Sequence, residues 1–127
     1  MYKKVLSLTF LTMMFLFASM AVTTPASAAQ DFGPYQWSTG DGRWDGKLEV
    51  SSNGQNVAAK IDVWTIETPV SIRLCSHNGN CTGFKSVSAG ATTVVYFTNM
   101  SSGTYYGDII SNHPTYEAAG EIKYTVY

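Results

Sequence analysis

The chain has 127 residues, enough for one domain, and its formal net charge is −1. This near-balance excludes a strongly basic protein that binds nucleic acid through phosphate contacts. Hydrophobic residues make up 45% of the chain and charged residues 13%, which is not the composition of an intrinsically disordered protein.

The first 28 residues have the features of a secretory signal peptide, in the right order. Two lysines precede an apolar run at 5–22, and a small-residue cleavage site, Ala-Ser-Ala, follows at 26–28. We expect residues 1–28 to be removed and residues 29–127 to form one secreted domain, without stable membrane insertion. A retained signal anchor is the alternative, because 18 apolar residues approach the length that spans a bilayer.

After the leader, the segment 30–42 is rich in glycine, serine and aromatic residues, and we expect it to lie across an edge of the domain. From residue 43 onward the periodicity is two, which is typical of strands that bury one face. No segment after residue 29 shows ten residues of helical pattern. The expected strands are 43–50, 57–66, 70–75, 84–88, 92–98, 104–111 and 122–126.

Turn residues separate these strands, as at 52–54, where Asn and Gly tolerate positive φ. Six or seven short strands at this spacing predict an all-β fold, a small antiparallel β-sandwich, with a small β-barrel as the alternative. Alternation against charged neighbours predicts the core. The expected core residues are Trp44, Leu48, Val50, Ile61, Val63, Ile72, Leu74, Val95, Phe97, Ile122, Tyr124 and Val126.

The two cysteines of the chain are Cys75 and Cys81. Export to an oxidising compartment favours a disulfide between them, and Gly79 lets the short intervening loop turn sharply. The simplest interpretation is a stapled loop, and a displayed recognition loop is the alternative. A redox or metal role lacks the C-x-x-C spacing and has one histidine, His77, inside the loop.

Catalytic chemistry has little support in the sequence. A Ser-His-Asp triad would need His77 or His113, and Asp108 is near His113 in sequence, but no nucleophile motif is present. Both histidines stand beside turn residues, which is typical of solvated loops. A small hydrolase is therefore the third hypothesis for function.

Asp41 and Asp45 lie in a glycine-rich stretch and form a weak candidate calcium site, because carboxylate oxygens are the ligands that Ca²⁺ prefers. The stretch lacks the spacing of an EF-hand loop. The alternative is a glycine-rich turn that enters the first strand, 43–50, with Asp45 on the outer face of that strand. We expect no other cofactor.

Exposed aromatic residues are the stronger functional signal. Alternation in 57–66 places Trp64 on the same face as Lys60 and Asp62, so we expect this face to be in contact with water. Tyr105 and Tyr106 are adjacent, so one of them points away from the core. We expect Trp64 and one of these tyrosines to form an aromatic contact surface.

The sequence therefore favours a secreted, non-catalytic binding module that acts at a cell surface, a cell wall or an extracellular partner. Its ligand would be a carbohydrate or an extracellular protein. The alternative is a secreted effector, such as a proteinaceous inhibitor or an antimicrobial or toxin-like protein. Asn80 and Asn99 begin Asn-x-Ser/Thr triplets, which are glycosylation sites in hosts that modify secreted proteins.

Overall fold

Alternating apolar and polar residues form β-strands throughout the part of the chain that the structure describes. The structure is a computed structural model, and it describes residues 28–127. The predicted signal peptide lies outside this range except for its last residue, so export and cleavage stay predictions. The strands are β1 (Gln30–Ser38), β2 (Lys47–Val50), β3 (Gln55–Val63), β4 (Val70–Ser76), β5 (Lys85–Val87), β6 (Thr92–Met100), β7 (Gly103–Ser111) and β8 (Ala119–Val126).

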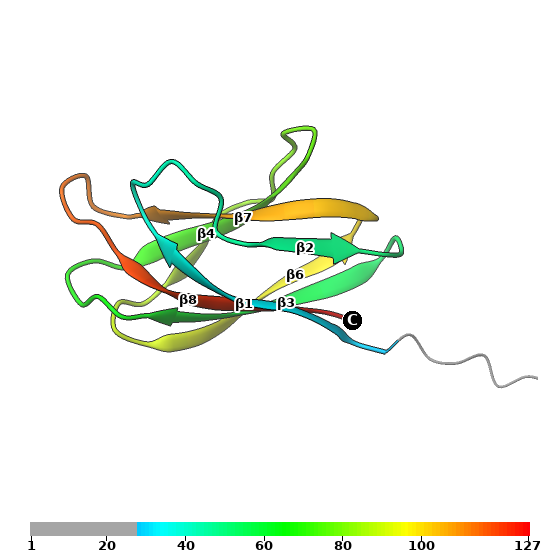
Figure 1. Cartoon of the computed structure of the whole chain (residues 1–127), viewed down its shortest axis with the longest axis horizontal. Coiled ribbons are helices and arrows are strands. Elements are labelled where there is room, and N and C mark those ends of the chain that lie inside the picture. Colours follow the sequence, from blue (N-terminus) through cyan, green and yellow to red (C-terminus); the bar gives the residue numbers. More distant parts are fainter. Residues whose placement is uncertain (1–27) are drawn as a thin grey trace, which may run out of the picture.

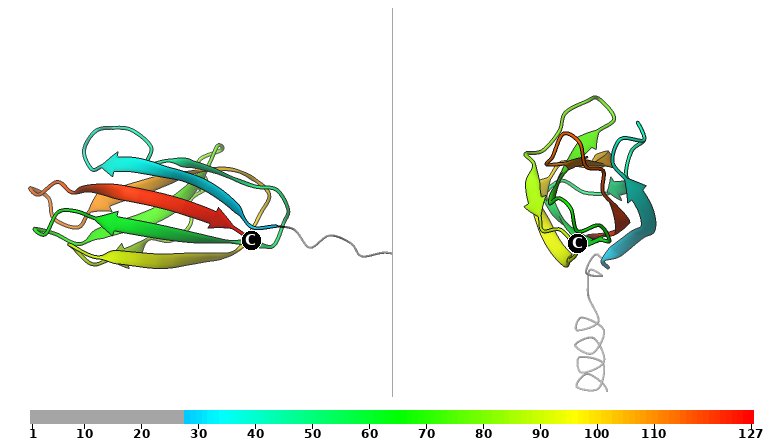
Figure 2. Two further views of the ribbon diagram at one scale, coloured as in Figure 1. Left: turned by 60° about the horizontal axis from the view of Figure 1, so that its bottom comes forward. Right: turned by 90° about the vertical axis from the view of Figure 1, so that its left-hand side faces the viewer.

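The strands form two antiparallel sheets that face one another as a β-sandwich (Figure 1), which confirms the predicted fold class. The strand order is β1-β8-β3-β6 in one sheet, called here the β3 sheet, and β2-β7-β4-β5 in the other, the β7 sheet. Figure 2 shows the four strands of the β3 sheet side by side and, end on, the two layers. None of residues 28–127 forms a helix that could cross a membrane.

The core lies between the two sheets. It consists of the alternate residues of each strand that point toward the opposite sheet. In β3, for example, Val57, Ala59 and Ile61 are fully buried. The predicted core residues are all buried with one exception. Trp44 was predicted to lie inward, and this is wrong: its side chain is 55% exposed.

The segment 30–42 also differs from its prediction. Residues 30–38 form β1, an edge strand paired with β8 from Gln30↔Val126 to Ser38↔Ala119. A register shift between Phe32 and Tyr35 contains the cis peptide bond Gly33–Pro34. This irregularity interrupts the alternation of polar and apolar residues, so the sequence of segment 30–38 does not show the pattern of a strand.

The connections gather at the two ends of the sandwich (Figure 1). One end carries the β1–β2 loop (39–46), the β3–β4 loop (64–69) and the β7–β8 loop (112–118). The other end carries the β4–β5 loop (77–84) and the short β6–β7 turn. The functional candidates lie in these connections and on the outer face of the β7 sheet.

Candidate functional site

The aromatic residues predicted to form one surface lie on different parts of the molecule. Trp64 directly follows β3 and is 57% exposed. Tyr105 is buried between the sheets, where its hydroxyl donates to the carbonyl of Ser101 at 2.8 Å. Tyr106 is therefore the tyrosine that points outward, from the β7 sheet. Because β3 and β7 belong to different sheets, the structure does not bring Trp64 and Tyr106 together.

Tyr106 is instead paired with Trp44. The two rings stack with their centroids 5.6 Å apart and an interplanar angle of 30°. This places Trp44 over the outer face of the β7 sheet, at the end of the β1–β2 loop. Sequence reasoning assigned Trp44 to the core because it extended the alternation of β2 too far toward the N-terminus.

Gly46 is the residue that ends this alternation. Its φ is +94°, a conformation that side-chain-bearing residues rarely adopt, and β2 begins at the next residue. An added Cβ would lie 2.5 Å from Cδ2 of Tyr35 and 2.9 Å from Cε2 of Tyr124. The backbone at Gly46 therefore turns under these two rings, and Trp44 faces outward as a result.

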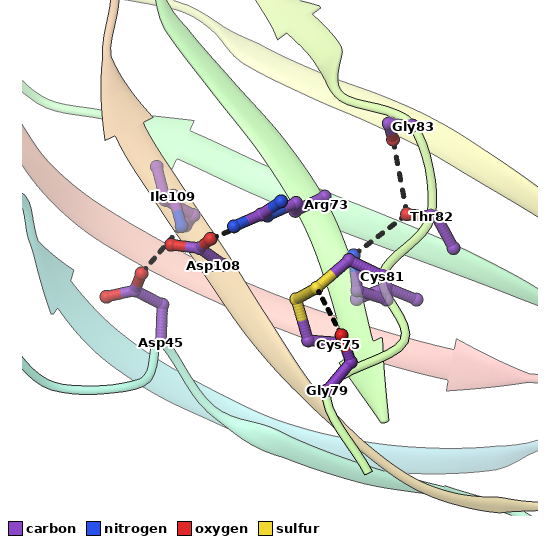
Figure 3. Close-up of polar contacts among 10 residues, drawn as sticks. Asp45, Arg73, Cys75, Gly79, Cys81, Thr82, Gly83, Asp108 and Ile109 are labelled. Carbon is purple, nitrogen blue, oxygen red and sulfur yellow. Dashed lines mark hydrogen bonds and ion pairs between the residues drawn. A yellow bond between two sulfur atoms is a disulfide. The ribbon is translucent and has the colours of Figure 1, made fainter. Parts of the chain in front are cut away.

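Asp45, between Trp44 and Gly46, anchors the loop to β7 and β8. Its side chain is almost fully buried, and Oδ2 accepts a hydrogen bond from the N–H of Ile109 at 2.7 Å (Figure 3). Its backbone N–H donates to the carbonyl of Gly107 at 2.8 Å, and its carbonyl accepts from the hydroxyl of Tyr124 at 2.6 Å. These three bonds hold the backbone beside Trp44 in one position.

Burial raises the pKa of Asp45 to about 7, because ionising a carboxyl group away from water is unfavourable. The hydrogen bond from Ile109 lowers the pKa, while the nearby carboxylates of Asp41 and Asp108 raise it. The anchor of the loop is thus a carboxyl group that changes its protonation state near neutral pH.

Two hollows adjoin Trp44, which lines both of them. One, of about 360 Å³, is bounded by the β1–β2 loop and includes Asp41, Arg43 and Asp108. The other, of about 350 Å³, includes Tyr35, Gln36, Lys47 and Tyr106. We call Trp44, Tyr106 and these two hollows the Trp44 surface. It combines a flat aromatic area with hydrogen-bonding side chains on both sides.

A cluster of polar and aromatic contacts continues the outer face of the β7 sheet beyond this surface. Arg73 donates from Nε to Oδ2 of Asp108 at 2.7 Å (Figure 3), and its guanidinium carbon lies 4.5 Å from the centroid of the Phe84 ring. Asp108 is therefore held by Arg73 at the rim of the first hollow. Its Oδ2 is occupied by Arg73, which leaves Oδ1 as the oxygen that can accept a further hydrogen bond.

The two histidines lie far from one another along the sandwich. His77 is exposed in the β4–β5 loop, and His113 is exposed in the β7–β8 loop at the opposite end. The ring of His113 lies 4.6 Å from the ring of Tyr116, and Nδ1 contacts the hydroxyl of Thr115 at 3.0 Å. The Ser-His-Asp arrangement considered from the sequence is not assembled around Asp108.

The candidate calcium ligands are both engaged in local hydrogen bonds. Asp41 accepts from the N–H of Arg43 at 2.9 Å and from the hydroxyl of Ser38 at 3.2 Å, while Asp45 accepts from Ile109. Within residues 28–127 there is no group of three or more His, Cys, Asp or Glu that could hold a metal ion. A calcium site at Asp41 and Asp45 stays a prediction, and the proposals below do not depend on it.

The predicted disulfide is confirmed. Cys75, near the end of β4, is bonded to Cys81, and their Cα atoms are 4.0 Å apart. Inside the closed loop, the N–H of Ser76 donates to the carbonyl of Asn80 at 2.7 Å. The bond therefore closes a tight turn at the end of the sandwich that lies away from the β1–β2 loop.

Comparison with known proteins gives only a similarity of fold. No family model matches the chain, and no curated protein matches its sequence. The chain is similar to the CBM36-1 domain of a multidomain xylanase from the hindgut metagenome of Trinervitermes trinervoides, with 9% identity, a TM-score of 0.47, and coverage of 77% of this chain and 96% of that one.

Two further solved structures are similar at the same level. A carbohydrate-binding module of Cellvibrio mixtus lichenase 5A has 17% identity and a TM-score of 0.41, over 76% of this chain and 95% of that one. A family two carbohydrate esterase from Cellvibrio japonicus has 12% identity and a TM-score of 0.41, over 80% of this chain and 34% of that one. At these scores the similarities carry no argument about function.

Proposed function

We propose that the chain is a secreted, non-catalytic binding module that takes a carbohydrate at the Trp44 surface. The observation that carries the proposal is an exposed tryptophan on a rigid support. Trp44 is 55% exposed, yet the residues beside it are fixed by three hydrogen bonds of Asp45 and by the turn at Gly46.

An exposed tryptophan leaves a large apolar area in contact with water, which is unfavourable by about 25 cal/mol per Å². Mobile side chains lower this cost by adapting to their neighbours, but the Trp44 ring is stacked on Tyr106 and the backbone beside it is hydrogen-bonded. A rigid aromatic ring of this kind suits a ligand that buries it, because little conformational freedom is lost on binding.

The chemistry around the ring favours a sugar as that ligand. A pyranose ring has an apolar C–H face that stacks on an aromatic plane, and hydroxyl groups that need hydrogen-bond partners. Gln36 and Lys47 flank one side of Trp44, and Arg43 and Asp108 flank the other. These side chains supply both donors and acceptors at the edge of the aromatic plane.

Trp64 is the matched control, because its exposure of 57% is almost equal to that of Trp44 while it lies beside the other sheet. Its backbone is also held, because its N–H donates to the carbonyl of Ala119 at 2.9 Å, but no aromatic ring among residues 28–127 stacks on it as Tyr106 does on Trp44. If the sequence-based prediction is right in its original form, Trp64 rather than Trp44 binds the ligand, and a comparison of the two variants decides between them.

The experiment is a binding measurement on the purified secreted protein. Sedimentation with insoluble cellulose, xylan, chitin and peptidoglycan identifies a polysaccharide that retains the protein, and calorimetry with its soluble oligosaccharides gives the affinity. Trp44→Ala should weaken binding by about 10- to 100-fold, the range of interface hot spots, with a small change in melting temperature. Trp64→Ala should leave the affinity unchanged.

Two results would overturn the proposal. If none of these polysaccharides retains the protein, the proposed carbohydrate ligand is wrong. If an extracellular protein binds specifically through Trp44, the ligand is a protein instead. Loss of binding in Trp64→Ala alone would move the site to the other sheet.

A further inference from the structure

A third hollow, separate from the two of the Trp44 surface, is lined mainly by uncharged polar residues. It has a volume of about 500 Å³ and lies between the β4–β5 loop and the β6–β7 turn. We call it the asparagine hollow, after its three amide side chains. Its lining consists of Ser76, Asn78, Asn80, Cys81, Thr82, Thr98, Asn99, Met100, Ser101, Ser102 and Tyr105, with no charged residue.

The wall formed by the β4–β5 loop is held by the backbone and the disulfide. Besides the bond from Ser76 to Asn80, the N–H of Thr82 donates to the carbonyl of Leu74 at 2.8 Å, and the hydroxyl of Thr82 accepts from the N–H of Leu74 at 3.0 Å. The side-chain amides of Asn78 and Asn80 make no hydrogen bond with any other described residue. The loop keeps its shape without using them.

The wall formed by the β6–β7 turn is held in a similar way. Asn99 has a φ of +53°, and its N–H donates to Oδ1 of Asn56 at 3.0 Å. The N–H of Ser102 donates to Oδ1 of Asn53 at 2.7 Å, and the N–H of Gly54 donates to the carbonyl of Met100 at 2.8 Å. The neighbouring β2–β3 turn thus fixes this wall, while the side-chain amide of Asn99 has no partner among residues 28–127.

From this arrangement we propose that the asparagine hollow is a second binding site, and that it takes an uncharged, hydroxyl-rich ligand, a neutral oligosaccharide. Each asparagine amide offers two donors and one acceptor, which match the hydroxyl groups of a sugar. All three asparagines are exposed, so their amides exchange water for sugar hydroxyls on binding, and the preorganised walls spare the cost of ordering a loop. The choice of a sugar among hydroxyl-rich ligands rests on the function proposed above.

The absence of charge from the lining sets the ligand class. A uronic acid or an amino sugar in this hollow would lose part of its hydration without meeting an opposite charge, which is unfavourable. A neutral sugar has no such penalty. The asparagine hollow should therefore discriminate against charged glycans more strongly than the Trp44 surface, where Asp41, Arg43 and Lys47 lie near the ring.

The two sites lie at separate places on the β7 sheet. The hollow includes Tyr105, which points between the sheets, whereas the Trp44 surface is built on its neighbour Tyr106, which points outward from the β7 sheet. A short oligosaccharide should therefore bind each site independently. A polysaccharide long enough to reach both would bind more tightly than either site alone, because the second contact becomes intramolecular.

The test is an NMR titration of the full secreted protein, which reports on each site separately through backbone amide shifts. The probes are cellohexaose, xylohexaose and mannohexaose, with hexagalacturonate and chitosan hexamer as the charged counterparts. At least one neutral hexasaccharide should cause saturable shifts at residues 78–82 and 98–102. These shifts should persist in Trp44→Ala.

Two variants remove the amides without disturbing the backbone. The double variant Asn78→Ala/Asn80→Ala should raise the dissociation constant at the hollow at least fivefold. Asn99→Gly should do the same, since glycine keeps the positive φ that alanine would strain. Gln30→Ala is the control, because it removes an exposed amide at the opposite edge of the β3 sheet, and it should leave the affinity unchanged.

The outcomes separate this inference from the proposed function. Shifts confined to the Trp44 surface with all three neutral probes would overturn the second site and leave the first intact. Shifts confined to the hollow would support the second site and show that the Trp44 surface does not take these three sugars. Tighter binding of either charged hexamer at the hollow would overturn the assigned ligand class.

Discussion

Oδ2 of Asp45 accepts a hydrogen bond from the backbone N–H of Ile109, 2.7 Å away, and so joins the β1–β2 loop to the middle of the β7 sheet. The carboxyl group is almost fully removed from water, and no cation is bonded to it among the described residues. The backbone beside Trp44 thus depends on a buried acid whose ionised form is disfavoured.

The free energy of unfolding should depend on pH through the protonation of Asp45. The folded pKa of Asp45 is about 7, above its usual value of 3.8. Between these values the folded protein holds the proton and the unfolded chain releases it, so the free energy of unfolding should fall as pH rises from 4 to 7. At about 1.4 kcal/mol per pKa unit, a shift of about three units corresponds to roughly 4 kcal/mol.

The check is chemical denaturation of wild type and Asp45→Asn at pH 4, 5.5, 7 and 8.5. Asparagine keeps an oxygen that accepts from Ile109 but does not titrate, so the variant should be the more stable protein above pH 7. The difference between the two curves cancels the other carboxyl groups. A difference that stays constant with pH would contradict the prediction.

Gly46 and Gly42 give a matched pair for the support of Trp44. Both have positive φ, of +94° and +70°, but only Gly46 has heavy atoms within 4 Å of an added Cβ, those of Tyr35 and Tyr124 among them. Gly42→Ala should therefore cost about 1 kcal/mol from backbone strain alone, and Gly46→Ala should cost more, roughly 2–4 kcal/mol. Thermal or urea unfolding measures both, and equal costs would show that the packing under Gly46 is unimportant.

The sequence predicted most of the fold because one face of each strand is buried. Every expected strand from residue 43 onward is present, and residues such as Leu74 and Tyr124 are fully buried as expected. β1 was missed because Gly33 and Pro34 interrupt its alternation, although Trp37 points inward. The irregularity removes the local pattern by which a strand is predicted. The pairing of β1 with β8 is a long-range contact that local periodicity does not indicate.

The candidate site was less accessible to sequence reasoning. The exposure of Trp64 followed from alternation along β3, but that of Trp44 depends on one backbone angle at Gly46. The stacking of Trp44 on Tyr106 joins residues from two separate segments, and periodicity within one strand contains no information about it. The sequence indicated that one of Tyr105 and Tyr106 points outward, without indicating which.

Removal of the disulfide should lower stability modestly. The bond from Cys75 to Cys81 closes a short loop, for which the loss of chain entropy in the unfolded state predicts about 2–2.5 kcal/mol. Cys75→Ala/Cys81→Ala should show this decrease in urea unfolding and should keep the overall fold by circular dichroism. Loss of the β signal would show instead that the disulfide is required for folding.

The three tryptophans should differ in their access to solvent. Trp44 and Trp64 are more than half exposed, while Trp37 is 4% exposed and its indole N–H has no hydrogen-bond partner among residues 28–127. In the double variant Trp44→Phe/Trp64→Phe, the remaining fluorescence should come from Trp37, with emission at short wavelength and weak quenching by acrylamide. Wild type should be quenched several times more strongly. Acrylamide is the suitable quencher because iodide is repelled by a negatively charged protein. Efficient quenching of Trp37 in the double variant would place β1 away from the core, and with it the edge strand that holds Tyr35 against Gly46.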